Sequence, residues 1–190
     1  MMSDHRVERP TTGAVWLVGV QLDPERDDPE VYTLLIEAKN EQPIVNRGRI
    51  VLFSRPELAP FALRMEEETV AHRSQKAPEE ISTVYQLGQA LSLIRDPTAE
   101  YDDAACIVNC LNLLFDCIVA IRLTVPTEYR ELLHMLADHL TFSKSLNEFD
   151  RLAAGWREQA FNGILWCLGA VCANSLVLTS PEPHPVETEG

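Results

Sequence analysis

The sequence AVWLVGVQL, residues 14–22, predicts a strand with apolar side chains on both faces. Most of its residues are β-branched, aromatic or otherwise apolar, which favours a strand. Successive side chains of a strand point to opposite faces, so Leu17 belongs to a different face from its neighbours. The face opposite to that of Leu17 carries Trp16, Val18, Val20 and Leu22. Both faces must be covered, and we expect helices on at least one of them.

Two more strands are predicted downstream. VYTLLIEA, residues 31–38, follows the charged loop DPERDDPE at 23–30, and RIVLF, residues 49–53, follows the polar loop KNEQPIVNRG at 39–48. Loops of about eight to ten residues between short strands are typical of an antiparallel meander. One face of the second strand is expected to carry Tyr32, Leu34, Ile36 and Ala38.

From Ser54 onward the apolar residues recur at three- and four-residue spacing, which predicts helices. Two capping boxes, Ser54 with Glu57 and Ser145 with Glu148, mark expected helix starts. Pro60 is expected to kink or restart the first helix. Thr127 is expected to cap the fourth. The predicted helices span about 54–72, 78–96, 102–124, 127–142 and 145–178.

These elements predict an α+β fold, in which a small N-terminal three-stranded antiparallel meander packs on a C-terminal bundle of about five helices. We expect a single domain over residues 14–178, with a β lobe at 14–53 and a helical lobe at 54–178. Residues 1–13 and 179–190 are polar and contain proline, and they are predicted to be flexible tails.

The chain is acidic, with 29 Asp and Glu residues against 16 Lys and Arg residues and a net charge of −13. This charge repels nucleic-acid phosphates and anionic membrane surfaces, so neither is expected as a partner. A basic protein partner would instead be attracted over a long range. Solubility alone is the alternative explanation of the acidity.

Five cysteines lie mostly in apolar stretches, without the regular spacing of a disulfide framework. Cys106, Cys110 and Cys117 share one face of the helix predicted at 102–124, and the other two lie on the last helix. Structural zinc sites usually take close cysteine pairs from tight turns, and the sequence has none. We therefore interpret these thiols as core side chains and expect no metal and no cofactor. Reduced thiols and a polar N-terminus predict a cytoplasmic location.

The same helix carries a polar stripe formed by Asn109, Asn112 and Asp116. A solvent-facing stripe needs no partner, whereas an unpaired buried charge is very costly. We expect Asp116 to be partly buried and paired with an arginine such as Arg151 or Arg157. A ligand pocket near Asp116 is the alternative.

The sequence contains no recognisable catalytic motif. H-x-x-x-D-H at 134–139 places His134 and Asp138 one turn apart, but His139 points about 100° away, so an exposed polar face is expected. Glycine-rich phosphate loops and a nucleophile elbow are absent from the sequence. The uncharged stretch 161–178 only just reaches the length of a membrane span, and its polar and small residues favour a buried bundle helix. Enzymatic activity is left open, and the sequence favours a non-catalytic role.

The densest acidic clusters are PERDDPE at 24–30 and MEEE at 65–68. We expect a non-catalytic interaction protein of the inhibitor, immunity or adaptor type, which docks a protein partner that is basic by charge complementarity. Its expected partner-binding residues are Asp27, Asp28, Glu66, Glu67 and Glu68. Two alternatives remain: a ligand-sensing or enzymatic domain with a pocket between sheet and helices near Asp116, and a structural subunit of a homo-oligomer.

Overall fold

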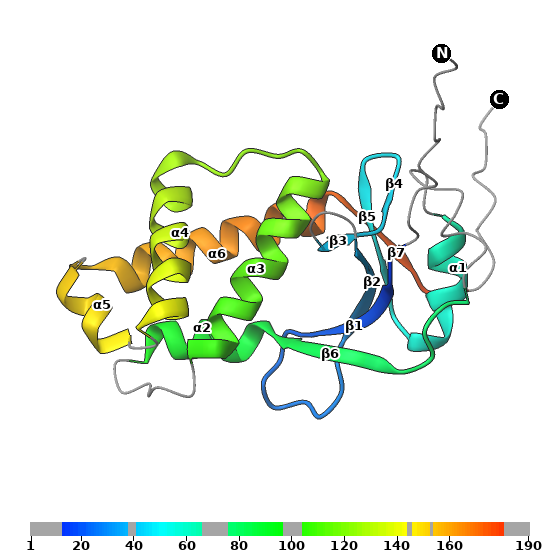
Figure 1. Cartoon of the computed structure of the whole chain (residues 1–190), viewed down its shortest axis with the longest axis horizontal. Coiled ribbons are helices and arrows are strands. Elements are labelled where there is room, and N and C mark those ends of the chain that lie inside the picture. Colours follow the sequence, from blue (N-terminus) through cyan, green and yellow to red (C-terminus); the bar gives the residue numbers. More distant parts are fainter. Residues whose placement is uncertain are drawn as a thin grey trace, which may run out of the picture.

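The chain folds into a mixed sheet with helices on both faces, as a computed structural model shows (Figure 1). The structure describes residues 13–37, 41–65, 76–96, 104–143, 146–152 and 154–180. Within these ranges, a large group of helices lies on one side of the sheet and one short helix lies on the other. The predicted α+β class is confirmed.

The sheet has seven strands within the described ranges. They are β1 (Val15–Gln21), β2 (Val31–Glu37), β3 (Glu41–Pro43), β4 (Val45–Asn46), β5 (Arg49–Phe53), β6 (Ile81–Gln86) and β7 (Ser175–Leu178). Their order is β4-β5-β2-β1-β6, with β3 paired to β2 and β7 paired to β5. β2 runs antiparallel to β1 and β5, whereas β6 is parallel to β1 and β7 is parallel to β5. β6 and β7 therefore form opposite edges of the sheet.

The helices begin with the 3₁₀ turn η1 (Pro56–Leu58) and end with α6. The α-helices are α1 (Ala59–Arg64), α2 (Leu87–Arg95), α3 (Ala104–Ala120), α4 (Thr127–Phe142), α5 (Leu146–Leu152) and α6 (Trp156–Ala173). Figure 1 places α2 to α6 together on one side of the sheet and α1 on the far side. None of the helices in the described ranges has both the length and the apolar character needed to cross a membrane.

β1 separates two hydrophobic cores, as its sequence predicts. Val18 and Val20 belong to the larger core, which they share with α2, α3, α4 and α6. Leu17, on the opposite face, belongs to a smaller core with β2, β5 and α1. Trp16 and Leu22 were expected on the same face as Val18 and Val20; Trp16 lies near the start of the strand and Leu22 just beyond its end, and they are 41% and 46% exposed.

The predicted three-stranded meander was wrong in the number of strands. β1, β2 and β5 match the three predicted strands, but β3 and β4 form within the predicted loop at 39–48. β6 and β7 arise in the range 54–178, which was expected to be helical. In β6 the sequence ISTVYQ is rich in β-branched and aromatic residues, and backbone pairing with β1 overrides its helix-like spacing.

The long helix predicted at 145–178 is also interrupted. Gly155 adopts a left-handed φ of 72° between α5 and α6, a conformation that glycine tolerates well. At the other end the side-chain amide of Asn174 donates a hydrogen bond to the Ala170 carbonyl at 2.8 Å, and β7 follows at once. The apolar stretch 161–178 is thus divided between a helix and an edge strand.

The helix starts differ from the predicted caps. η1 follows Arg55, which forms no capping bond, so Ser54 is not the expected cap. α4 has Pro126 rather than Thr127 as its N-cap. The prediction for Pro60 is confirmed, because α1 starts anew at Ala59 and places this proline in its first turn. Ser145 and residues 66–72 lie outside the described residues.

Close packing between α4 and α6 depends on a small side chain. A Cβ atom on Gly163 of α6 would stand 3.1 Å from Tyr129 Cβ and 3.2 Å from Leu133 Cδ1, both on α4. The small residues Ala160 and Cys167 on the same stripe are fully buried. Small residues on this face of α6 therefore let α4 approach closely.

We expect Gly163→Val to lower the free energy of unfolding by about 1–3 kcal/mol, because its methyl groups would force α4 and α6 apart. The matched control is Gly169→Ala on α6, where an added Cβ meets no atom within 4 Å. That control should leave stability unchanged or raise it by up to about 1 kcal/mol, because alanine favours a helix over glycine. Urea unfolding followed by circular dichroism measures both. Equal effects of the two variants would contradict the packing described.

Candidate protein-binding surface

The loop between β1 and β2, residues 22–30, carries five acidic side chains and one arginine and is termed the acidic loop. Its two ends are tied together by Glu30. The carboxylate of Glu30 accepts the backbone N–H groups of Leu22 at 2.8 Å and Asp23 at 3.1 Å. The Leu22 bond is the main reason why the pKa of Glu30 lies below its ordinary value. The loop is therefore closed by a carboxylate that favours its charged form.

Further hydrogen bonds hold the interior of the acidic loop. Asp23 accepts the N–H of Glu25 through Oδ1 at 3.0 Å and the N–H of Arg26 through its carbonyl at 3.2 Å. The side-chain amide of Gln21, at the end of β1, donates to the carbonyl of Arg26. These bonds use groups of the loop and of the residue just before it, so the backbone conformation of the loop is set locally.

The acidic loop also packs against the sheet and α2. A Cβ atom on Gly88 of α2 would come within 2.1 Å of the Leu22 carbonyl oxygen and 2.9 Å of Pro24 Cδ. At the other end of the loop, a Cβ atom on Gly19 of β1 would come within 2.5 Å of Pro29 Cγ. Both glycines thus provide room for the loop, which is fixed at two places.

The predicted residues Asp27 and Asp28 lie at the outer part of the acidic loop. Both are exposed, and neither forms a hydrogen bond or ion pair with the described part of the chain. The pKa of Tyr32 is raised, chiefly by burial, and the negative charge of Asp28 adds to this shift. The other predicted residues, Glu66, Glu67 and Glu68, lie outside the described residues.

The acidic loop begins beside the end of the edge strand β6, where Gln86 pairs with Gln21 of β1 (Figure 1). β6 is mostly exposed along its whole length, including two large apolar side chains. Ile81 is 39% exposed and Val84 is 40% exposed, and Trp16 on the neighbouring β1 is 41% exposed. An anionic loop and an apolar strand edge therefore adjoin each other on one side of the molecule.

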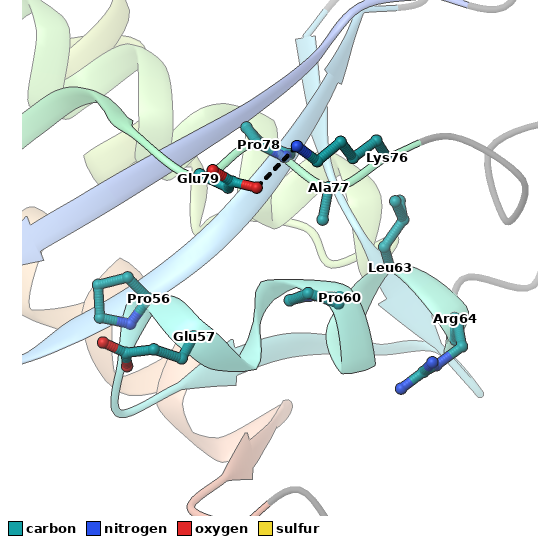
Figure 2. Close-up of a pocket in the computed structure, with 9 residues that line it drawn as sticks. All are labelled: Pro56, Glu57, Pro60, Leu63, Arg64, Lys76, Ala77, Pro78 and Glu79. Atoms are coloured by element: carbon teal, nitrogen blue, oxygen red, sulfur yellow. Dashed lines mark ion pairs between the residues drawn. The ribbon is translucent and has the colours of Figure 1, made fainter.

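An open pocket of about 410 Å³ lies near the start of β6, between α1 and the segment 76–79 (Figure 2). Its charged lining residues are Glu57, Arg64, Lys76 and Glu79, and its other lining residues are Pro56, Pro60, Leu63, Ala77 and Pro78. Lys76 Nζ and the Glu79 carboxylate form an ion pair at 2.7 Å, drawn in Figure 2. Among the described residues, this lining contains no histidine, cysteine, serine or threonine. The hydrogen bond from Lys76 to Glu79 raises the pKa of Lys76, so its amine stays protonated and is a poor nucleophile.

Asp116 is half-buried on α3, and no described arginine pairs with it, so the expected pairing with Arg151 or Arg157 was wrong. Arg157 instead binds Asp150 with two bonds, Nε to Oδ1 at 3.0 Å and Nη2 to Oδ2 at 2.9 Å. Its third nitrogen donates to two carbonyl groups at the end of α2, at 3.0 and 2.9 Å. Arg151 lies exposed on α5. The pocket in Figure 2 lies beside α1, on the opposite face of the sheet from Asp116.

The electrostatic surroundings of Asp116 disfavour its charged form. Burial raises the pKa of Asp116 from 3.8 to about 6, and the carboxylate of Glu41 on β3 adds to the effect. Across from it on β6, the pKa of Tyr85 is also raised, chiefly by burial and then by the charges of Glu41 and Asp116. No hydrogen bond or ion pair joins Asp116 to another described residue. Asn109 and Asn112 on the same stripe are exposed.

Three of the five cysteines are core side chains, as their apolar setting predicts. Cys110, Cys117 and Cys167 are buried, whereas Cys106 is half-buried and Cys172 is exposed. Burial raises the pKa of Cys117 to about 12 and that of Cys167 to about 11, so both stay protonated at neutral pH. Thiols in this state are poor nucleophiles and poor metal ligands. Across the described ranges, no three side chains of the metal-binding types come together. The absence of a metal stays a prediction.

The two histidines of the H-x-x-x-D-H motif have separate surroundings. His134 stacks on Phe115 of α3 with ring centroids 4.3 Å apart. His139 Nε2 lies 2.6 Å from the Ser143 hydroxyl at the end of α4. Asp138 is exposed and forms no bond to either ring. The motif therefore does not form a joint acid–base or metal site.

We expect Asp116→Asn to stabilise the protein at pH 8. The folded-state pKa of about 6 exceeds the ordinary value of 3.8, so the folded chain loses stability as pH rises through 6, where Asp116 becomes charged. The full shift corresponds to about 3 kcal/mol, and solvent screening at this half-buried site reduces the expected gain to about 1 kcal/mol.

This gain should shrink to about a third near pH 4.5, because the folded protein keeps Asp116 protonated there while the unfolded chain is already largely ionised. Urea unfolding of both proteins at the two pH values measures the difference, with Asp138→Asn as a control on the exposed face of α4. The control should change stability by less than about 0.5 kcal/mol. A loss of stability in Asp116→Asn at pH 8 would show that Asp116 has a partner that stabilises its charge.

Comparison with known proteins shows a likeness of fold. No model of a protein family matches the chain, and no curated protein matches it in sequence. Its fold is similar to that in the crystal structure of the SatS C-terminal domain in complex with bromine, with a TM-score of 0.58 and 15% sequence identity. The likeness covers 86% of this chain and 94% of the SatS domain. At this identity the similarity concerns the arrangement of helices and strands alone.

Proposed function

We propose that this chain is a non-catalytic interaction protein that docks a basic protein partner, in the manner of inhibitors, immunity proteins and adaptors. The observation that carries the proposal is the pre-formed acidic loop beside the exposed apolar edge strand β6. Charged groups of this kind guide the encounter of two proteins, and apolar contacts hold the complex together.

The closed conformation of the acidic loop supports a role in binding. A flexible loop loses conformational freedom when a partner fixes it, and this loss weakens the complex. The Glu30 carboxylate and the Asp23 side chain already fix the loop in the free protein. Asp27 and Asp28 are left exposed with no bond to the described chain. Their full charge is therefore available to a cationic surface.

The neighbouring apolar side chains supply the other half of the proposed interface. Leu22 at the base of the loop is 46% exposed, and Ile81 and Val84 on β6 are exposed to a similar degree. Single exposed apolar residues are ordinary on protein surfaces. Here they adjoin an edge strand and an anionic loop, which is the mixed composition of a transient protein interface.

The chemistry of the other candidate sites favours binding over catalysis. Among the described residues, the pocket beside α1 has no histidine, cysteine, serine or threonine, the buried thiols stay protonated, and the histidines of α4 do not converge. We further propose that the protein acts in the cytoplasm without a cofactor, because free thiols suit a reducing compartment.

The test is reversal of charge in the acidic loop. Asp27→Lys with Asp28→Lys should slow association with the partner about tenfold at low salt and flatten its salt dependence, because steering forces are lost. Dissociation should change less than about threefold, since the apolar contacts remain. The partner is first isolated by co-purification from the native cell and identified by mass spectrometry, and stopped-flow mixing then gives the rates.

The control reverses two exposed acids on α4, Glu131→Lys with Asp138→Lys, which changes the net charge equally. Reversal at Glu66, Glu67 and Glu68 tests the second predicted cluster, and we expect only one of the two clusters to matter. An equal slowing by the α4 control would show that net charge alone acts. An unchanged on-rate in all three variants would assign the acidity to solubility.

A further inference from the structure

We propose that an extended, basic segment of the partner adds as a new strand to the free edge of β6. This inference rests on the proposed function and specifies how the partner is held. Three features of β6 carry it: a backbone edge with which no described strand pairs, exposed apolar side chains, and acidic residues at the two ends of the strand.

The backbone edge of β6 offers unused hydrogen-bonding groups. One side of the strand pairs with β1 from Leu17 to Gln21, and no described strand pairs with its other side. Alternate residues of an edge strand point their N–H and C=O groups outward, where another chain can pair with them. Proteins usually protect such an edge with lysine, proline or extreme shortness. The six residues ISTVYQ contain neither lysine nor proline.

The side chains of β6 give an incoming strand apolar contacts on the α1 side of the sheet. Ile81 pairs with Leu17, and Val84 pairs with Gly19, so both lie on that face. A register shift between them, opposite Leu17 and Val18, brings two residues three positions apart to the same face. Side chains on an added strand would lie beside these two, as cross-strand neighbours do.

Acidic residues lie at both ends of β6. Glu80 precedes the strand, is exposed and forms no bond to the described chain, whereas Glu79 is paired with Lys76. The acidic loop with Asp27 and Asp28 lies at the other end, beside Gln86. A segment with lysine or arginine near its ends would complement both. A second copy of this chain would bring like charges together, so β6-to-β6 dimerisation is disfavoured.

The opposite edge strand β7 is a poorer site for strand addition. It has four residues against the six of β6, and its residues Leu176 and Leu178 are half-buried. Its Val177 is nevertheless 50% exposed, comparable with 40% for Val84. This pair of valines therefore offers a matched comparison between the two edges.

The probe is a fluorescein-labelled peptide of ten residues in which valine and lysine alternate, with binding measured by fluorescence anisotropy. Val84→Lys should weaken its binding at least tenfold, because the added cation repels the peptide and protects the edge. Val177→Lys, the same change on β7, should alter binding less than about twofold, since no strand is added there. Circular dichroism checks that both variants remain folded.

N-methylated peptides separate strand addition from simple side-chain docking. Methyl groups on one alternate set of backbone nitrogens should abolish binding, and methyl groups on the other set should leave most of it, because only one set faces β6. Equal binding of both methylated peptides would overturn strand addition. Strand addition would also be overturned if the unmethylated peptide failed to bind at millimolar concentration. The same holds if the wild-type protein were a dimer that Val84→Lys converts to a monomer. The on-rate test of the acidic loop judges the proposed function separately, because it uses the co-purified partner.

Discussion

The arrangement of this protein depends on burying both faces of β1. Val18 and Val20 on one face and Leu17 on the other are all nearly inaccessible to water. Exposing this apolar surface would cost about 1.5–3 kcal/mol for each large side chain. The strand therefore needs cover on two sides, which α2 to α6 supply on one face and α1 on the other (Figure 1). When both faces of a sheet are covered, its backbone groups remain accessible only at its edges.

The position of β6 at one edge follows from this constraint. Because β2 pairs antiparallel with one side of β1, the chain that returns after α1 can join β1 only on its other side. There it runs parallel to β1 and leads directly into α2, which covers the larger core. The acidic loop leaves β1 at the same end and packs against Gly88 of α2. The anionic surface and the open strand edge are thus adjacent for topological reasons.

Much of this fold could be predicted from local sequence, but contacts between distant segments could not. The strands at 15–21, 31–37 and 49–53 have β-branched and aromatic runs that stand out against charged loops. β6 was misread because Ile81, Val84 and Tyr85 also fit a helical period, and only pairing with β1 decides between the two. Its β-branched composition was the signal that could have identified it.

The candidate site, too, could be predicted from the sequence only in part. Its charge at Asp27 and Asp28 was visible in the sequence, whereas the Glu30 hydrogen bonds that close the loop depend on the folded backbone. The predicted pairing of Asp116 with Arg157 was wrong, because Asp150 on α5 lies next to Arg157 and accepts two hydrogen bonds from it. Spacing along the chain alone cannot determine which of several nearby acidic residues pairs with an arginine.

Strand addition at β6 can be measured by NMR as amide hydrogen exchange of its six residues, with and without the valine–lysine peptide. An added strand hydrogen-bonds to alternate residues of the edge, so exchange should slow at every second amide from Thr83 to Gln86, beyond the register shift. The amides of β7 should exchange at unchanged rates. Unchanged exchange along β6, together with saturated peptide binding, would show that the partner segment is held elsewhere and would contradict this account.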